Sequence, residues 1–407
     1  MTVAAGLTVT GLGTVAMMAL TARSLPAAQY AAFAVWWTMA VLLGTSFGVF
    51  EAYLARLVVT EVAAGRTPTP ATGLMIGRAL LVVLAVTCLV LPMSPWLGDR
   101  LFAGHTGAAL LLPLFTAAAA TQALQRGAAT GRRRFGAIAG QLATDGVLRI
   151  ALVAALVAAG ADTVTSLALV CCLAAAASLV VGSALCRSWW AAPRLRGREA
   201  AIRPLLFLLA GSVGPLLANN GSVPWLANTH DVGTYTLGAF AGAITLSRIP
   251  TQFISAAFSP LLAHLSHAID VGDETTFRHL RRRAIITATT LGVVYVFVFA
   301  ALGPALLTAY LGPRYHLGVG YLAALAAASS VMFVGVVQQA GLAALDRWSS
   351  IAVAWGAGTG AFLSVLALPG DALLRASLAP LGAVLVAVVL LMATRIHLVG
   401  RVDAASG

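Results

Sequence analysis

One arginine inside a long apolar stretch is the first residue whose chemistry stands out. Arg248 lies near the middle of the segment "GAFAGAITLSRIPTQFISAAFSPLLAHLS". On a helix with about 100° between residues, the same face carries a row of polar side chains: Thr245, Thr251, Gln252, Ser255 and Ser259. A charged row facing lipid is costly, so we expect this row to line a wet, partly cationic cavity that binds a substrate. The alternative is a structural ion pair; snorkelling is disfavoured because Arg248 is roughly 15 residues from either helix end.

A second candidate is a possible ion pair within the segment 136–160. Gln141, Asp145 and Arg149 follow one another at four-residue spacing. An acidic residue four positions before a basic one is the favourable order for a helical ion pair. Two interpretations stay open: the neutral pair holds helices together, or Asp145 and Arg149 take part in coupling to a proton.

Glu51 is the other acidic candidate for coupling. It shares a helix face with small residues, among them Gly44 and Gly48, which let backbones approach closely. Because Glu51 lies near the end of its predicted helix, it can also simply reach water or Arg56.

The segment "LLFLLAGSVGPLLANNGSVPWL" places polar side chains beside two prolines. Ser212, Asn219 and Ser222 share a face, and Pro215 and Pro224 interrupt the helical hydrogen bonds. One interpretation is a bent helix that lines a cavity, with Asn219 as a substrate-binding candidate. The other is a proline kink with hydrogen bonds between helices.

These candidates lie in a chain with the composition of a membrane protein. It is 60% hydrophobic and 9% charged, with a mean hydropathy of +0.93, whereas about 25% of a soluble protein is charged. Apolar runs long enough to cross a bilayer predict twelve helices: 1–22, 30–56, 74–94, 106–126, 136–160, 163–187, 203–226, 233–262, 284–310, 317–345, 348–368 and 373–397. The first run has no basic segment before it, so we interpret it as a membrane helix and not as a signal peptide. Long loops are expected only at 57–73, 188–202 and 263–283.

The arginines predict the orientation of these helices. All 25 basic residues are arginine. Nineteen lie at the C-terminal end or in and beside the loops that follow the second, fourth, sixth, eighth and tenth predicted helices, and two lie inside helices. The loops on the opposite side of the membrane carry only four: Arg23, Arg100, Arg314 and Arg375. By the positive-inside rule both termini are expected in the cytoplasm. The same rule explains the net charge of +12 without nucleic acid as a partner.

A weak internal repeat divides the chain into two halves. At an offset of 205 residues Tyr30 matches Tyr235, and at an offset of 213 residues Gln125 matches Gln338. The expected fold is therefore an all-α integral membrane protein with two six-helix bundles, related by a pseudo-two-fold axis along the membrane normal. The expected parts are an N-terminal bundle, a basic cytoplasmic linker, a C-terminal bundle and a cytoplasmic tail: 1–187, 188–202, 203–397 and 398–407.

Motifs for other functions are missing from the sequence. It has no Walker A motif, no catalytic triad and no paired catalytic carboxylates, so we expect no enzyme and no cofactor. The four cysteines have no CxxC spacing. His264 and His267 are spaced for a metal, but a solvated helix face is the preferred interpretation. "GLGTVA" at 11–16 and "GAGTG" at 356–360 are interpreted as helix packing.

Two segments resemble the MOP superfamily. "LSRIPTQFISAAFSPLLAHLSHAIDVGDETTFRHLRRRA" is similar to the eighth-helix region of its bacterial flippases, with Arg248, Pro250, Pro260 and Ser266 at the motif positions. "ARSLPAAQYAAFAVWWTMAVLLGTSFGVFEAYLAR" resembles the opening of that family. The MurJ-type branch has two further helices and several arginines in its first two helices. Here the first helix offers Arg23 alone, which favours the Wzx-like polysaccharide exporters.

The resemblance implies a function for these residues. The expected substrate is an undecaprenyl-diphosphate-linked oligosaccharide, flipped across the bacterial cytoplasmic membrane by alternating access for polysaccharide biosynthesis. Arg248 would then contact the diphosphate, Arg23 is a further substrate-binding candidate, and H⁺ or Na⁺ is a possible coupling ion. The alternative is a MATE-like or other secondary exporter of small molecules. Many MATE exporters use an acidic residue in the first or seventh helix, and neither helix has one here.

Overall fold

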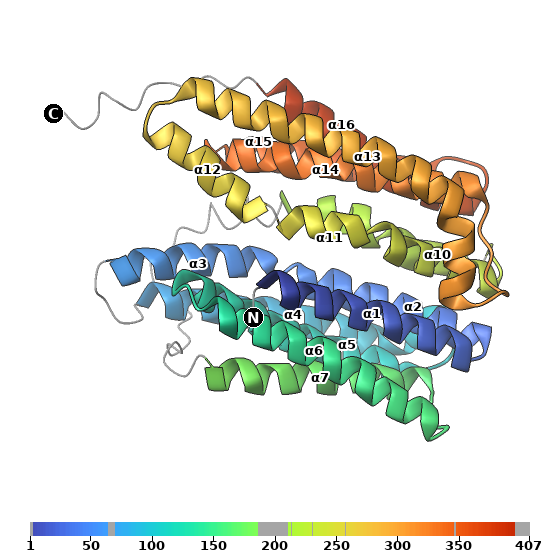
Figure 1. Ribbon diagram of the computed structural model, residues 1–407. Coiled ribbons are helices and arrows are strands. Elements are labelled where there is room, and N and C mark those ends of the chain that lie inside the picture. The colour runs from blue at the N-terminus through green and yellow to red at the C-terminus, as the bar shows by residue number, and fades with distance from the viewer. Residues whose placement is uncertain are drawn as a thin grey trace. The chain divides into compact units, whose positions relative to one another are not determined.

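The computed structural model describes residues 3–63, 70–185, 211–212, 214–229, 231–256, 258–345 and 347–394. Every regular element in these ranges is an α-helix (Figure 1). Ten stretches of the described residues are long and apolar enough to cross a membrane. The expected all-α membrane fold is therefore confirmed. Of the two remaining expected helices, 203–226 falls partly outside the described residues, and 233–262 is divided into shorter helices.

The helices group into two compact units. Unit 1 comprises the described part of Met1–Leu206 together with Val223–Gly242 and Thr308–His316. Its helices are α1 (Val3–Ser24), α2 (Ala27–Thr45), α3 (Gly48–Ala63), α4 (Pro70–Leu101), α5 (Thr106–Gly131), α6 (Phe135–Ala158) and α7 (Val164–Leu185). It also takes in most of α9 (Ser222–Thr229) and the first part of α10 (Thr234–Ser247). The predicted boundaries of the two sequence halves stay a prediction.

Helix α5 is the centre of unit 1. It packs against α2, α3, α4 and α7, while α1 lies along α6. The stretch "TAAAATQALQRGAATG" of α5 is rich in alanine and glycine, and small side chains let helix backbones approach closely in a membrane protein. The core of the unit therefore depends on close contacts between helices.

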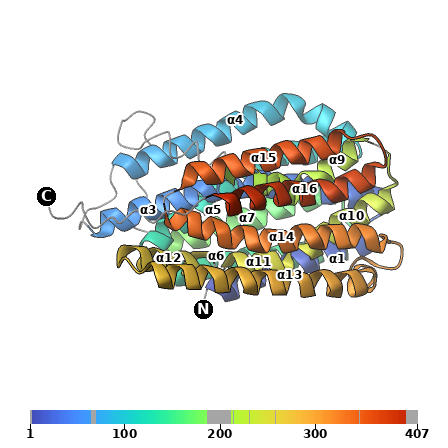
Figure 2. The ribbon, with the colours of Figure 1, turned by 90° about the horizontal axis from the view of Figure 1, so that it is seen from above.

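Unit 2 comprises the described part of Phe207–Ser222, then Ala243–Leu307 and the described part of Leu317–Gly407. Its helices are the end of α10, α11 (Ile249–Ala256), α12 (Phe258–Asp270), α13 (Glu274–Leu311, up to Leu307), α14 (Val319–Ala344), α15 (Trp348–Ala367) and α16 (Ala372–Ala393). Helix α16 lies between α14 and α15 (Figure 2). Helix α14 also packs against α11 and α12.

The prediction of one continuous helix over 233–262 is wrong, because the helix is interrupted at Arg248. Helix α10 ends at Ser247, α11 begins at Ile249, and Arg248 occupies a turn between them. Pro250 has no N–H to donate, and its ring collides with the carbonyl four residues earlier, which ends a regular helix. The hydroxyl of Tyr295 donates to the Ser247 carbonyl at 3.0 Å, so a side chain from α13 satisfies a backbone group at the break.

The expected helix 30–56 is also divided, into α2 and α3. The break falls in "GTSFG", where Thr45 and Ser46 donate to the carbonyls of Val41 and Leu43 at 2.7 and 2.6 Å. Hydroxyl side chains that bond the preceding turn compete with the helical backbone pattern, and glycine lowers helix propensity.

The loop expected at 263–283 is mostly helical. Helix α12 runs to Asp270 and α13 begins at Glu274, so only a short turn separates them. The Asp273 carboxylate caps α13 by accepting from the Thr276 N–H at 2.9 Å and from the Thr275 hydroxyl at 2.7 Å. Hydrogen bonds from Thr276 and Thr275 lower the pKa of Asp273 to about 2, so the cap stays ionised above that pH.

Glycines mark the closest approaches of helices in both units. A Cβ on Gly13 of α1 would lie 2.6 Å from the Gly146 carbonyl of α6, and one on Gly358 of α15 would lie 2.7 Å from the Ala383 carbonyl of α16. These two glycines come from the GLGTVA and GAGTG segments, and their contacts support the interpretation of both as helix packing.

We expect Gly13→Ala and Gly358→Ala to destabilise the protein by about 1–3 kcal/mol each, because the added methyl group overpacks a backbone contact. Gly11→Ala and Gly360→Ala are the matched controls, since a Cβ at either position meets nothing within 4 Å. Thermal unfolding of the purified protein in detergent measures the difference. Equal midpoints for the test and control variants would contradict the close packing.

Candidate functional site

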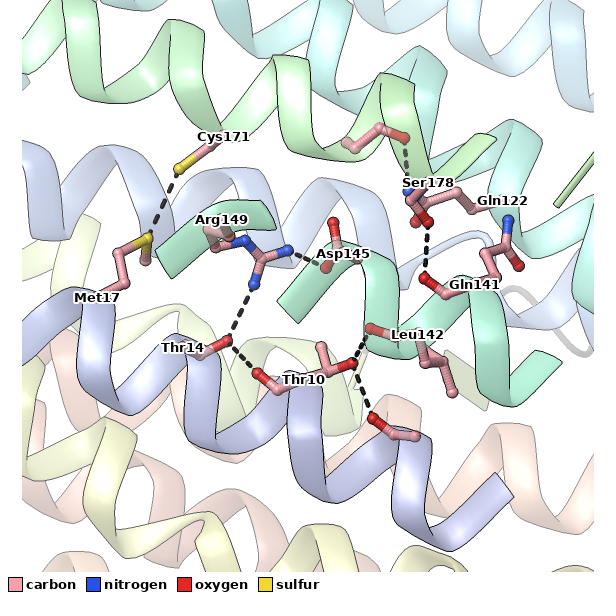
Figure 3. Close-up of polar contacts among 12 residues, drawn as sticks. Thr10, Thr14, Met17, Gln122, Gln141, Leu142, Asp145, Arg149, Cys171 and Ser178 are labelled. Atoms are coloured by element: carbon pink, nitrogen blue, oxygen red, sulfur yellow. Dashed lines mark hydrogen bonds and ion pairs between the residues drawn. The ribbon is translucent and has the colours of Figure 1, made fainter. Parts of the chain in front are cut away.

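The first polar cluster of the structure lies within unit 1 and centres on Arg149. Asp145 and Arg149 are both on α6 and only 7% and 4% exposed, and the guanidinium forms an ion pair with the Asp145 carboxylate. The same guanidinium donates to the Thr14 hydroxyl of α1 at 3.0 Å (Figure 3). It also lies 4.6 Å from the ring centroid of Trp37 on α2. The helical ion pair suggested by the four-residue spacing is therefore present.

This cluster joins three helices through one neutralised cation. The pair brings no net charge into the unit, and Arg149 adds a hydrogen bond to α1 and a cation–π contact to α2. Within the described structure the Oδ1 atom of Asp145 has no hydrogen-bond partner. The geometry fits the interpretation that the pair holds helices together, and a coupling role for Asp145 and Arg149 stays a prediction.

A second row of polar side chains joins α5, α6 and α7. Gln141 of α6 donates to the Gln125 side chain of α5, whose amide donates in turn to Ser183 of α7 at 2.8 Å. Ser178 of α7 donates to the Gln141 carbonyl at 2.9 Å (Figure 3). The four-residue spacing placed Gln141 beside the ion pair but did not predict this row. A glutamine or serine inside an apolar helix could have indicated it, because such side chains need hydrogen-bond partners from neighbouring helices.

The matching glutamine of the second half is buried in the same way. Gln338 of α14 is fully buried, and its side-chain oxygen accepts from Nε and Nη2 of Arg281 on α13 at 3.1 and 2.7 Å. In each unit a repeated glutamine therefore satisfies polar groups between helices.

Glu51 of α3 has a partner that its sequence neighbours did not suggest. Its Oε2 atom accepts from Nε of Arg126 on α5 at 2.9 Å and forms an ion pair with Nη2 of the same guanidinium, also at 2.9 Å. A Cβ on Gly127 would lie 2.6 Å from the Glu51 carbonyl, so the two helices are in backbone contact at this point. The side chain of Arg56, the partner considered from the sequence, lies outside the described residues. The coupling role of Glu51 stays a prediction.

Arg248 lines a small cavity within unit 2. Its Nη1 atom donates to the side-chain oxygen of Asn220 at 2.7 Å. The cavity measures about 20 Å³ and is lined by Ala218, Asn219, Ile244, Ser247, Arg248, Leu325, Ala328, Ser329, Pro380 and Val384. A cavity needs roughly 10–15 Å³ to hold one water molecule. The cavity can therefore hold a water but no diphosphate in this conformation.

The structure places the other residues that were predicted to bind substrate with Arg248 in different positions. Asn219 lines the same cavity, whereas the partner that bonds the guanidinium is the adjacent Asn220. Thr245 is half-buried on α10. The side chains of Gln252 and Ser255 lie outside the described residues. The binding role of this group stays a prediction.

Arg23 lies apart from that group, at the end of α1 in unit 1. It is exposed, and its guanidinium donates to the carbonyl of Ala309. It lines a separate pocket of about 430 Å³. Within the described ranges no three histidine, cysteine, aspartate or glutamate side chains are grouped so that they could hold a metal ion.

We expect Arg149→Met to destabilise the protein by about 3–5 kcal/mol, because it leaves the Asp145 charge buried without its partner. The double variant Asp145→Leu with Arg149→Met should recover much of this loss. Arg278→Met is the matched control: it breaks a pair with Glu274 at the same four-residue spacing, but those side chains are 71% and 42% exposed, so the loss should stay below about 1 kcal/mol. Similar unfolding midpoints for Arg149→Met and Arg278→Met would contradict the role given to the buried pair.

The comparisons with known proteins concern the whole chain. No protein family model matches it. Two uncharacterized proteins of Mycobacterium tuberculosis, from strains CDC 1551 / Oshkosh and ATCC 25618 / H37Rv, are each 27% identical over 369 residues, which covers 86% of this chain and 80% of theirs.

Several solved transporter structures have a similar fold over almost the full length of this chain. An inward-facing multidrug resistance MATE transporter of the MOP superfamily has a TM-score of 0.64 at 13% identity and covers 96% of both chains. A MATE structure in a bent conformation has a TM-score of 0.60 at 15% identity, over 96% of this chain and 92% of its own. A MOP superfamily transporter from Pyrococcus furiosus, described by a reverse polarity of its binding pocket that suggests a different function, has a TM-score of 0.57 at 13% identity, over the same shares. The chain therefore has the fold of the MATE transporters of the MOP superfamily.

Proposed function

We propose that this protein flips an undecaprenyl-diphosphate-linked oligosaccharide across the cytoplasmic membrane by alternating access, for cell-surface polysaccharide biosynthesis. The observation that carries the proposal is the contrast between Arg149, inside α6, and Arg248, at the break between α10 and α11. Arg149 is neutralised by Asp145, whereas Arg248 bonds the neutral amide of Asn220 and has no carboxylate partner among the described residues. A cation left without a counter-charge beside a cavity is suited to an anionic substrate.

A diphosphate is an anion whose chemistry fits a guanidinium. The planar fork of an arginine pairs with two oxygens at once and keeps its charge at every physiological pH. In the proposed cycle the lipid tail stays in the bilayer while the glycan and the diphosphate pass through the protein. The neutral Asn220 bond is then exchanged for a charged one when the substrate arrives.

The size of the cavity requires that this exchange include a movement of helices. The cavity of about 20 Å³ is lined in part by residues of α10, α14 and α16, including Ser247, Ser329 and Pro380. A substrate reaches Arg248 only when these helices separate. The break between α10 and α11 and Pro380 inside α16 are points where a helix can bend. This geometry is consistent with a closed state of an alternating-access cycle.

The second candidate function is a MATE-like export of small molecules. The fold favours it, since MATE structures match nearly the whole chain. Against it stands the cationic character of the Arg248 cavity, together with the lack of acidic residues in α1. The reverse pocket polarity described for the Pyrococcus furiosus transporter is consistent with different pocket charges on this fold. In either case H⁺ or Na⁺ is the proposed coupling ion, with Asp145 and Glu51 as candidates to respond to it.

We expect Arg248→Gln to reduce export per folded molecule about tenfold or more. Glutamine can still donate to Asn220 but carries no charge for the diphosphate, so folding and membrane insertion should be kept. Arg248→Lys should retain part of the activity, because an ammonium keeps the charge without the two-pronged geometry. Arg248→Glu should be the least active, since it places like charge against the substrate. Arg278→Gln is the control for an exposed arginine.

The assay is translocation of a labelled undecaprenyl-diphosphate oligosaccharide in proteoliposomes, divided by the amount of folded protein. Normal translocation per molecule in the Gln and Glu variants would sink the role of Arg248 in substrate contact. If none of the variants, nor the wild-type protein, moved this lipid but wild-type cells exported small cations, the MATE-like function would be favoured.

We also propose that both termini, and the turn between α5 and α6, face the cytoplasm, because arginines concentrate on that side. In a chain without its four native cysteines, Ala161→Cys in the turn between α6 and α7 should react with an impermeant thiol reagent in intact cells. Arg133→Cys should react only after the membrane is opened. The opposite pattern would reverse the topology.

A further inference from the structure

A pocket in unit 1 has features of an anion site that the proposed transport mechanism does not use. It is lined by residues from the end of α1, the starts of α2 and α10 and the segment Thr308–His316. Its volume is about 430 Å³, within the range of roughly 300–1,000 Å³ that small-molecule sites occupy.

The charges of this pocket have one sign. Arg23 and Arg314 both line it, and none of its lining residues is acidic. Neither arginine forms an ion pair with a carboxylate within the described part of the chain. Arg23 is held in place by its bond to the Ala309 carbonyl, which leaves the guanidinium with further N–H groups. Two cations around one pocket favour a ligand with more than one negative charge.

The aromatic rings of Tyr235 and Tyr315 form one wall of the pocket. Tyr315 is 3% exposed, and its ring packs edge-on against Tyr30 and Tyr235, with centroids 5.2 and 5.5 Å apart. Its hydroxyl donates to the Ala22 carbonyl at 3.4 Å. A Cβ on Gly238 would lie 3.0 Å from the rings of Tyr30 and Tyr315, so this glycine leaves space for the aromatic cluster.

The tyrosines also keep the wall uncharged. Burial raises the pKa of Tyr315 to about 12, with a smaller contribution from Tyr235. Its phenol therefore stays neutral at physiological pH and adds no negative charge to oppose an anion.

We propose that this pocket binds the phosphate-bearing headgroup of an anionic amphiphile, with Arg23 and Arg314 holding the phosphate oxygens. Phosphate is the anion for which the arginine fork is best suited. The volume of about 430 Å³ leaves room for further headgroup atoms beside the phosphate. The binding site stands on its own residues and does not depend on the proposed flipping of a glycan.

Binding to the purified full-length protein tests the proposal. Inorganic diphosphate is the first probe, titrated calorimetrically at low salt in neutral detergent. Arg23→Gln and Arg314→Gln should each weaken binding about tenfold or more, since each removes a charge-assisted hydrogen bond. Arg100→Gln is the control, because Arg100 is an exposed arginine of unit 1 outside the pocket, and it should bind like the wild type.

Two lipid arms distinguish the source of the phosphate. Diphosphate binding is measured in phosphatidylcholine nanodiscs as the baseline. Weaker binding in phosphatidylglycerol nanodiscs would show that a bulk anionic lipid competes with diphosphate. Weaker binding after undecaprenyl phosphate is added to the phosphatidylcholine nanodiscs would show that a polyprenyl carrier competes. Competition by either one supports the pocket and names its ligand. Unchanged diphosphate binding in the double variant Arg23→Gln with Arg314→Gln would overturn the proposal. If Arg248→Gln alone removed binding, the pocket would be rejected while the proposed role of Arg248 would stand.

Discussion

Every polar group placed among these apolar helices needs a partner supplied by the protein, because hydrocarbon supplies none. In the clusters described above, a small number of side chains supply most of these partners, while Oδ1 of Asp145 has none among the described residues. Arg149 is met by Asp145 and Thr14, and Gln141 is met by Gln125. These bonds cross between helices, so the same contacts that satisfy polar groups also fix which helices are neighbours. In unit 2, by contrast, the Arg248 guanidinium is met by the neutral amide of Asn220, and the Arg281 guanidinium by the neutral amide of Gln338.

That difference gives the two units different characters. The Arg149 cluster contains its own counter-charge and a stacked tryptophan, and it can persist through a conformational cycle without outside help. The Arg248 position combines a broken helix, a small cavity and a cation without an acidic partner in the described chain. A group in that situation responds to whatever anion enters, since binding provides the charge compensation that the protein does not. The proposed transport role rests on this imbalance and not on the likeness of the fold.

Much of the helical layout could be predicted because apolar runs and membrane thickness determine it. The predicted helix 106–126 and the observed α5 begin at the same residue, and the helical spacing of Asp145 and Arg149 was enough to suggest their ion pair. The breaks in 30–56 and 233–262 were not predicted. A proline or a Gly-Thr-Ser stretch can either bend a continuous helix or end it. Tertiary contacts such as that of Tyr295 with Ser247 help to determine which of the two occurs. Asn220, Arg126 and the pocket at Arg23 were missed because each depends on contacts between segments far apart in the chain.

Unit 1 is assembled from three separate parts of the chain, the last of which is Thr308–His316. Tyr315, in that last part, lies against Tyr30 from the first. Proteins are synthesised from the N-terminus, and domains generally fold as their residues emerge. Here the first helices enter the membrane long before the residue that fills their aromatic cluster has been made. The N-terminal unit therefore reaches its final packing only after nearly half of unit 2 has been translated, so part of unit 2 is made before unit 1 is complete.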